Sequence, residues 1–343
     1  MRRVALAAAM LGLLAACDGP DRWTIADASF FPVAIDHWSD DRSFLVGSYE
    51  HGAVARMSDN GILDDRPYLP SSAAQDGRRR ALRISVDGVR DRLWVLDTDR
   101  VYVYALRSRK LLLSIGLPHG AQVTRTGCLP DMTFSPFTGT VYVADGREPT
   151  LHAIYEDGAT EALVRTELRL HSDQRGEIGR ISALAVVPGP HALLAGSAET
   201  GTLWRVDPLT GKARRIEVKD VSSLRGICAL RAVAASPLSH TQRGDAPHEF
   251  YFTSMTSNAL YGLVLQPSLE AGHAVAVTRA QALESPIGIA PIRGYVVATS
   301  SQLDRHKDLG GPAAPLMPFR LVAMPAAIGP LAADASIARR PLR

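Results

Sequence analysis

The chain has 343 residues, of which 46% are hydrophobic and 21% are charged. Its 38 Lys and Arg residues and 35 Asp and Glu residues give a formal net charge of +3, and no basic run is longer than Arg78-Arg79-Arg80. Nucleic-acid binding needs a concentrated basic face, so we expect no nucleic-acid partner. The 326 residues after Cys17 are enough for one large all-β domain.

The first 17 residues have the pattern of a secretion signal. Met1-Arg2-Arg3 is followed by an apolar or small stretch and then by Leu14-Ala15-Ala16-Cys17. The apolar stretch is too short for a membrane-spanning helix, which favours a cleaved signal peptide. The ending resembles the bacterial lipobox, which predicts that Cys17 becomes the acylated, palmitate-bearing first residue of the mature protein. The alternative is an ordinary signal peptide in which the Cys is coincidental.

A lipid anchor on Cys17 would place the protein in the bacterial cell envelope, on the periplasmic face of a membrane. Several acyl chains together give a stable anchor, whereas one chain binds reversibly. The next residue is Asp18. In many Gram-negative systems an Asp at this position resembles the signal that retains lipoproteins in the inner membrane, so we expect that membrane.

A unit of about 45–60 residues recurs through the rest of the chain, each copy containing short apolar strands separated by turns. We expect residues 18–29 to form a linker with a closing strand near Trp23-Thr24-Ile25, residues 30–324 to form the repeats, and residues 325–343 to form a tail. The six copies are Phe30–Gly61, Ala81–Leu113, Leu129–Gly158, Ile181–Ile216, Leu224–Leu265 and Ser285–Met324.

The segments within each copy have the composition of β-strands. Arg92–Leu96 and Thr140–Ala144 are short, rich in β-branched and aromatic residues, and bounded by turn residues. Asn60-Gly61 is one of several pairs that tolerate the positive φ of a hairpin turn. Six such units predict an all-β fold, a six-bladed β-propeller with four-stranded antiparallel blades around a central channel. A linear solenoid is less compatible, because repeat lengths vary and no polar capping repeat is present.

Two cysteines remain after Cys17, and an oxidising compartment would allow them to pair. Cys128 and Cys228 fall in the third and fifth copies, on blades that are not neighbours. We therefore expect two separate buried thiols rather than a disulfide. Neither CxxC nor a Cys/His cluster with zinc spacing is present.

The repeats resemble a known propeller family. FFPVAIDHWSDDRSFLVGS, from Phe30 to Ser48, is similar to the first blade of the gluconolactonase, regucalcin and luciferin-regenerating-enzyme family. LPDMTFSPFTGTVYVADG, from Leu129 to Gly146, resembles the middle-blade line of that family. The resemblance covers about Phe30 to Met324. It implies a six-bladed propeller with a divalent metal, usually calcium, that polarises a lactone or ester carbonyl at the channel mouth.

The positions that correspond to the family's metal ligands have changed here. Calcium requires several oxygen ligands. Asp131 is the only carboxylate kept, and Ser182 adds a hydroxyl. The other corresponding positions hold Val33, Arg80, Pro130, Arg225 and Ile287. The two arginines would repel a cation. We therefore expect no metal cofactor, with Asp131 as the one plausible ligand if a metal is bound.

We expect a ligand-binding site at the channel mouth, formed by Arg80, Asp131, Ser182 and Arg225. Paired guanidinium donors there could bind a carboxylate or a phosphate. The competing interpretations are an ion pair between Arg225 and Asp131, or an Asp131 that caps the backbone of its own turn.

The sequence thus favours a membrane-anchored periplasmic lipoprotein that binds a small ligand or an envelope protein without catalysis. The alternative is a calcium-dependent or other divalent-metal-dependent lactonase or esterase, with Asp131 as the catalytic residue. A third hypothesis is an envelope scaffold that uses the inserts at Ser236–Pro247 and Asp304–Pro318.

Overall fold

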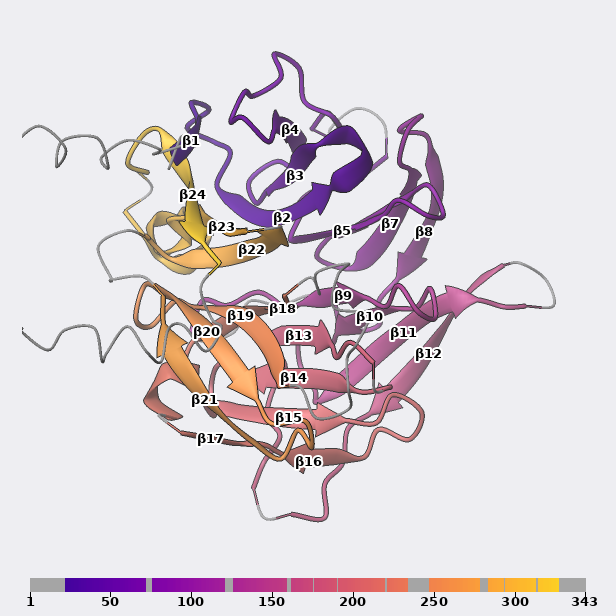
Figure 1. Ribbon diagram of the computed structural model, residues 1–343. Coiled ribbons are helices and arrows are strands. Elements are labelled where there is room, and N and C mark those ends of the chain that lie inside the picture. Colours follow the sequence, from indigo (N-terminus) through magenta and orange to yellow (C-terminus); the bar gives the residue numbers. More distant parts are fainter. Residues whose placement is uncertain are drawn as a thin grey trace, which may run out of the picture.

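The fold is known from a computed structural model that describes residues 22–71, 76–120, 126–158, 162–174, 176–189, 191–219, 221–233, 247–277, 283–292, 294–312 and 314–326. The predicted signal peptide, nearly all of the predicted tail and most of the Ser236–Pro247 insert lie outside these residues. Strands make up almost all of the regular structure (Figure 1). The described helices are single 3₁₀ turns: η1 (Ser39–Asp41), η3 (Val221–Leu224), η4 (Leu303–Arg305) and η5 (Lys307–Leu309). None of them is long and apolar enough to cross a membrane.

Six sheets follow one another along the chain, which confirms the predicted six-bladed β-propeller. Blade 1 contains β2 (Pro32–Trp38), β3 (Ser43–Ser48) and β4 (Val54–Ser58). Blade 2 contains β5 (Arg83–Asp87), β6 (Arg92–Leu96), β7 (Arg100–Ala105) and β8 (Leu111–Gly116). Blade 3 contains β9 (Met132–Phe134), β10 (Val141–Ala144), β11 (Thr150–Glu156) and β12 (Leu163–Arg169).

The second half of the ring repeats this order. Blade 4 contains β13 (Ala183–Val186), β14 (Leu193–Ser197), β15 (Thr202–Val206) and β16 (Ala213–Arg215). Blade 5 contains β18 (Ile227–Ala232), β19 (His248–Ser254), β20 (Ala259–Leu265) and β21 (Ala271–Ala276), together with β17 (Glu217–Lys219). Blade 6 contains β22 (Pro286–Ile292), β23 (Tyr295–Ser300) and β24 (Phe319–Pro325), together with β1 (Arg22–Ile25).

Two blades depart from the predicted four antiparallel strands. Blade 1 has three strands, extended only by isolated bridges such as Val54 with Leu69. Blade 5 has five, because β17 adds to the outer side of β21 in the parallel direction. Only Ile216 separates β17 from β16, so the chain passes directly from the outer edge of blade 4 to the outer edge of blade 5. We call residues 213–219 the strap.

The N-terminal strand closes the ring, as the sequence predicts. β1 pairs with β24, joining Trp23 to Leu321 and Ile25 to Phe319. Figure 1 shows indigo β1 beside yellow β24. Gly61, in the Asn60-Gly61 turn of blade 1, has a φ of +78° and lies against the Trp23 indole, where a Cβ would overlap the ring. Glycine is therefore required there both by the backbone and by the close approach.

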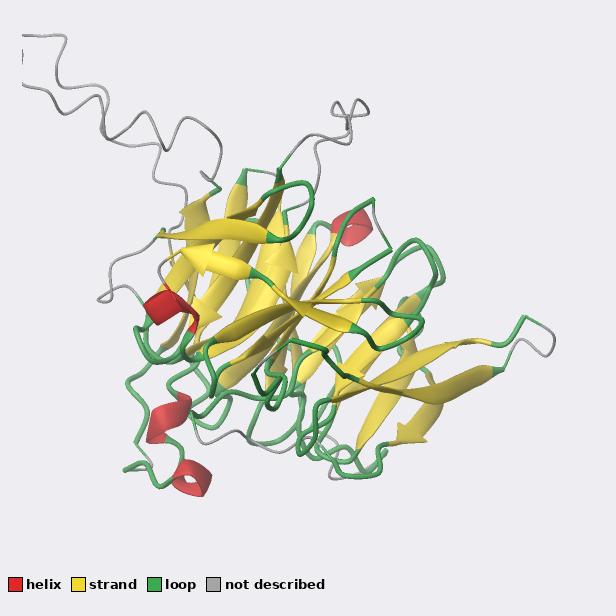
Figure 2. Ribbon diagram, turned by 90° about the horizontal axis from the view of Figure 1, so that it is seen from below, coloured by secondary structure: helices red, strands yellow, loops and turns green. Residues whose placement is uncertain are grey.

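The innermost strands β2, β5, β9, β13, β18 and β22 surround the axis, each in contact with the next. Neighbouring inner strands run in the same direction. Ser182, just before β13, bonds to Ile227 at the start of β18, and Asp36 near the end of β2 bonds to Val86 near the end of β5. We call the side on which these strands begin the start face, and the side on which they end the end face. Figure 2 shows loops gathered at both ends of the strands.

Apolar side chains fill the space between successive blades. Trp94 in β6 and Trp204 in β15 are both 0% exposed. The largest core cluster joins residues of blades 6, 1, 2 and 3, and a second joins blades 4 and 5. At roughly 1.5–3 kcal/mol for each fully buried large apolar side chain, these layers supply most of the stabilisation of the ring.

Candidate functional site

A buried ionic network occupies the centre of the propeller. Asp131 precedes β9 and is 0% exposed. Its Oδ1 accepts a hydrogen bond from Arg83 Nε at 2.8 Å. Arg231 approaches end-on, with Nη1 donating to Oδ2 at 2.9 Å and Nη2 donating to Oδ1 at 3.0 Å. The three residues come from blades 2, 3 and 5, so the network joins three blades across the axis.

Backbone donors complete the surroundings of the Asp131 carboxylate. Met132 N donates to Oδ1 at 2.9 Å, and Leu184 N donates to Oδ2 at 2.8 Å. Burial opposes ionisation of this carboxyl, but Arg231 and Arg83 outweigh it and hold its pKa below the ordinary value of 3.8. The side chain is therefore an ionised carboxylate whose two oxygens accept five N–H bonds.

The network does not suit the divalent cation that the family resemblance implies. A cation needs free oxygen lone pairs, and both Asp131 oxygens face N–H donors. The two guanidinium groups beside it would repel a second positive charge. Across the described residues, no group of three or more His, Cys, Asp or Glu side chains is placed to hold a metal ion.

Arg80 lies on the start face, away from Asp131. Its guanidinium pairs with Asp308 and lies 3.9 Å from the centre of the Tyr49 ring, a cation–π contact. The hydrogen bond from Arg80 is the main cause of a lowered pKa for the Asp308 carboxyl. Arg80 thus joins the loop before blade 2 to the insert of blade 6.

The other two predicted site residues also lie apart. Ser182 is 0% exposed, and its hydroxyl donates to Ile227 O at 2.6 Å and accepts from Ala198 N at 2.9 Å. Arg225 is exposed and packs beside Gly201. The structure therefore does not bring Arg80, Asp131, Ser182 and Arg225 together into one site.

The sequence interpretation missed Arg83 and Arg231, the actual partners of Asp131. Both stand in otherwise apolar inner strands, in Ala81-Leu82-Arg83-Ile84 and Ala229-Leu230-Arg231-Ala232. A charged residue in a strand that is expected to be buried requires a partner of opposite charge. This requirement could have identified Arg83 and Arg231 from the sequence, with Asp131 as their partner carboxylate.

The prediction of separate thiols was wrong. Cys128 and Cys228 form a disulfide with their Cα atoms 4.9 Å apart. They do lie on blades 3 and 5, which are not neighbours in the ring. Both, however, lie at the starts of innermost strands, where blades converge on the axis, so the gap between alternate blades is small enough for a disulfide.

A second polar cluster closes the start face between blades 6 and 1. His306, between η4 and η5, is 2% exposed and contacts Glu50 through Nε2. The Phe31 and Tyr49 rings lie nearly perpendicular to the imidazole, each with its ring centroid 4.8 Å from that of His306. Hydrogen bonds from His306 and Lys307 overcome desolvation and lower the pKa of the Glu50 carboxyl. A cavity of only about 160 Å³ adjoins this cluster.

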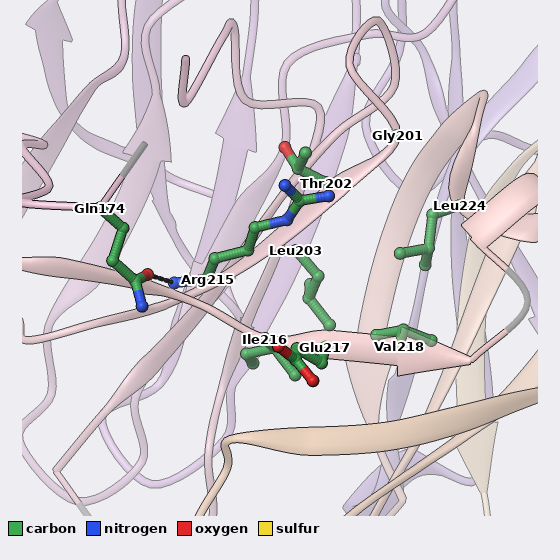
Figure 3. A pocket seen from close by; sticks show the side chains of 9 residues that line it. All are labelled: Gln174, Gly201, Thr202, Leu203, Arg215, Ile216, Glu217, Val218 and Leu224. Atoms are coloured by element: carbon green, nitrogen blue, oxygen red, sulfur yellow. Dashed lines mark hydrogen bonds between the residues drawn. The ribbon is translucent and has the colours of Figure 1, made fainter. Parts of the chain in front are cut away.

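Two further concave surfaces, each larger than this cavity, lie at the outer boundary of blades 4 and 5, on the two sides of the strap. Cleft A has a volume of about 340 Å³, and cleft B, lined by β17, β20, β21 and nearby loops, has about 420 Å³. These volumes fall within the range of small-molecule sites. Cleft A is lined by Gln174, Gly201, Thr202, Leu203, Arg215, Ile216, Glu217, Val218 and Leu224 (Figure 3).

Cleft A combines an apolar floor with two charged side chains, Arg215 and Glu217. Leu203, Ile216 and Leu224 are 1–2% exposed and form the floor. The Arg215 side chain extends toward Thr202, while its backbone N donates to Gln174 Oε1 at 2.6 Å (Figure 3). Within the described part of the chain, the Arg215 guanidinium has no hydrogen-bond or ion-pair partner.

These features define a propeller with a filled axis and peripheral clefts, a fold suited in general to binding ligands or partners. No protein-family model matches the chain, and no curated protein matches its sequence. Among solved structures, the Malassezia sympodialis allergen Mala s 1 matches with a TM-score of 0.62 at 12% identity, over 90% of this chain and 97% of that one. U3-55K matches with a TM-score of 0.56 at 10% identity, over 89% and 98%. At these identities the likeness shows the fold alone.

Proposed function

We propose that the protein is a lipid-anchored periplasmic binding propeller that takes a small, partly apolar anion in cleft A. The observation that carries this proposal is the Arg215 guanidinium, which lies in the cleft above buried Leu203 and Ile216 without an acceptor of its own. An anionic group would bind the Arg215 guanidinium, and an apolar segment would cover the floor.

Titration calorimetry with octanoate tests this site. We expect saturable one-to-one binding with a Kd of about 1 mM, as a ligand of this size allows. Arg215→Gln should weaken binding about fivefold, because it removes an ion pair made by an exposed arginine, worth about 1 kcal/mol. Arg214→Gln is the matched control, since Arg214 is an exposed neighbour on β16 that does not line the cleft. Equal binding by both variants would contradict the assignment of cleft A.

We propose the lipid anchor on the residues around Cys17. Labelled palmitate should be incorporated into the wild-type chain and not into Cys17→Ser. If Asp18 directs inner-membrane retention, fractionation should find the protein there, and a change of Asp18 should redistribute it. A wild-type chain that takes up no palmitate would contradict the anchor.

We also propose that binding occurs without the metal-dependent chemistry of the gluconolactonase family, because donors occupy both oxygens of Asp131. Calorimetry of the chelator-treated protein with calcium and zinc tests this. One-to-one binding together with lactone or ester hydrolysis would instead favour the alternative, a metal-dependent lactonase or esterase that uses Asp131.

A further inference from the structure

The most exposed large apolar side chains of the described residues gather on one face. Val89 is 92% exposed, Leu209 89%, Ile62 68% and Phe137 63%. They belong to blades 2, 4, 1 and 3; Val89, Leu209 and Phe137 lie within turns, and Ile62 directly follows one, so none of them is on a strand. Isolated exposed apolar residues are ordinary on protein surfaces, so their shared placement is what requires an explanation.

All four turns lie on the end face. Val89 is in the β5–β6 turn and Phe137 in the β9–β10 turn, and both turns follow the end of an innermost strand. Ile62 follows β4, whose last residue Ser58 pairs with the first residue of β3. Leu209 follows β15, whose last residue Val206 pairs with the first residue of β14.

Blade 6 adds Tyr295, 51% exposed, which begins β23 on the same face. Among the described residues, the exposed large apolar side chains on the start face are Leu316 and Met317, at 49% and 40% exposure. The remaining exposed large apolar residues lie on the outermost strands β8 and β21: Leu111, Leu112, Leu113 and Val275. The two faces of the propeller therefore differ in apolar character.

The N-terminal strand comes from the end face. β1 runs antiparallel to β24, pairing Arg22 with Val322 and Ile25 with Phe319, and β24 ends at Pro325 opposite Tyr295. β1 therefore runs toward the start face, and the chain that precedes it enters blade 6 from the side on which Tyr295 lies.

The distance from Cys17 to this face is limited by covalent geometry. Five peptide units connect Cys17 to Arg22 and span at most about 18 Å. Val322, which pairs with Arg22, precedes Pro325 by three strand residues. It therefore lies about 10 Å from Pro325 along β24, toward the start face. A lipid anchor on Cys17 would thus lie no more than about 8 Å beyond that level, and it would hold the end face close to the membrane surface.

We propose that the end face docks on the phospholipid surface, with Ile62, Val89, Phe137 and Leu209 inserted among the headgroups. The inference rests on the proposed lipid anchor at Cys17. Apolar side chains of interfacial proteins lie about 5–10 Å into the headgroup and acyl boundary, a depth that turn tips on a closely tethered face can reach. The start face then points away from the bilayer.

Fluorescence quenching in vesicles tests this orientation. The full-length lipidated protein, carrying a fluorophore on Phe137→Cys, is reconstituted into phosphatidylcholine vesicles with doxyl-labelled lipid. Glu148→Cys is the matched control, because Glu148 is exposed in the β10–β11 turn of the same blade, on the start face. We expect the probe at 137 to lose roughly half of its emission, as its depth predicts, and the probe at 148 to lose almost none.

A second variant separates apolar insertion from proximity alone. With the probe kept at 137, changing Ile62, Val89 and Leu209 to Ser should reduce quenching about twofold, and these exposed changes leave the core intact. The docking would be overturned, with the anchor left in place, by either of two results for protein that sediments with vesicles. In one, neither probe is quenched; in the other, only the probe at 148 is quenched. Protein that does not sediment with vesicles would overturn the anchor and the docking together.

Discussion

Asp131→Asn should strongly destabilise the propeller, because it removes the negative charge from the central network while preserving the side-chain volume. Arg83 is 1% exposed and Arg231 is 19% exposed, so both would retain a buried positive charge without its counter-charge. The amide NH₂ would also face N–H donors in either orientation: Leu184 N and Arg231 at the Oδ2 position, or Arg83 and Arg231 at the Oδ1 position. Removing one partner of a buried pair costs about 3–5 kcal/mol, and we expect a loss in that range.

Urea unfolding followed by circular dichroism measures this loss by linear extrapolation. Glu167→Gln is the control, since Glu167 pairs with Arg165 on the exposed outer strand and should change the unfolding free energy little. The pKa of Asp131 is lowered in the folded protein, so its contribution is complete above about pH 5 and is lost as pH falls below the ordinary value of 3.8. The difference between wild type and Asp131→Asn should therefore shrink below pH 4. A loss under about 1 kcal/mol at pH 7 would refute the argument that the network stabilises the ring.

Two further changes probe how the ring is held together. Replacing Cys128 and Cys228 by Ala should lower the unfolding free energy by about 4–5 kcal/mol, because the disulfide closes a loop of 100 residues, and chemical denaturation without reductant would show it. Unchanged stability would mean that the thiols do not pair in the protein. Gly61→Ala should lower the melting temperature more than Gly294→Ala, since both residues have positive φ but only Gly61 touches Trp23. Equal shifts would argue against that contact as a constraint on β1.

The blades were predictable because their signal is local. Runs such as Arg92–Leu96 are buried strands whose composition and flanking turns are visible in a few consecutive residues. The closing strand near Trp23 was also predictable, because a propeller must pair its last blade with another strand. The ring itself therefore followed from repetition.

The site was less predictable because its contacts are distant in sequence. Asp131 lies 48 positions from Arg83 and 100 from Arg231, and the family alignment directed attention to Arg80 and Arg225 instead. Those two arginines are in loops that precede inner strands, where a side chain can turn outward. Arg83 and Arg231 instead lie within the inner strands β5 and β18. The strap was missed because β17 is three residues long and pairs in parallel, which no local pattern indicates.

The pairing of β1 with β24 also fixes the order in which the protein can be completed. Arg22 and Val322 are 300 positions apart, so β1 meets its partner β24 only after every other blade has been synthesised. Contacts of such sequence separation form slowly, because most of the chain must be arranged before they can close. Until then, blade 6 lacks its outer strand and β24 exposes an unpaired edge, a surface prone to association with other chains. The last four-residue ladder to form therefore determines when the newly made protein stops being vulnerable to aggregation.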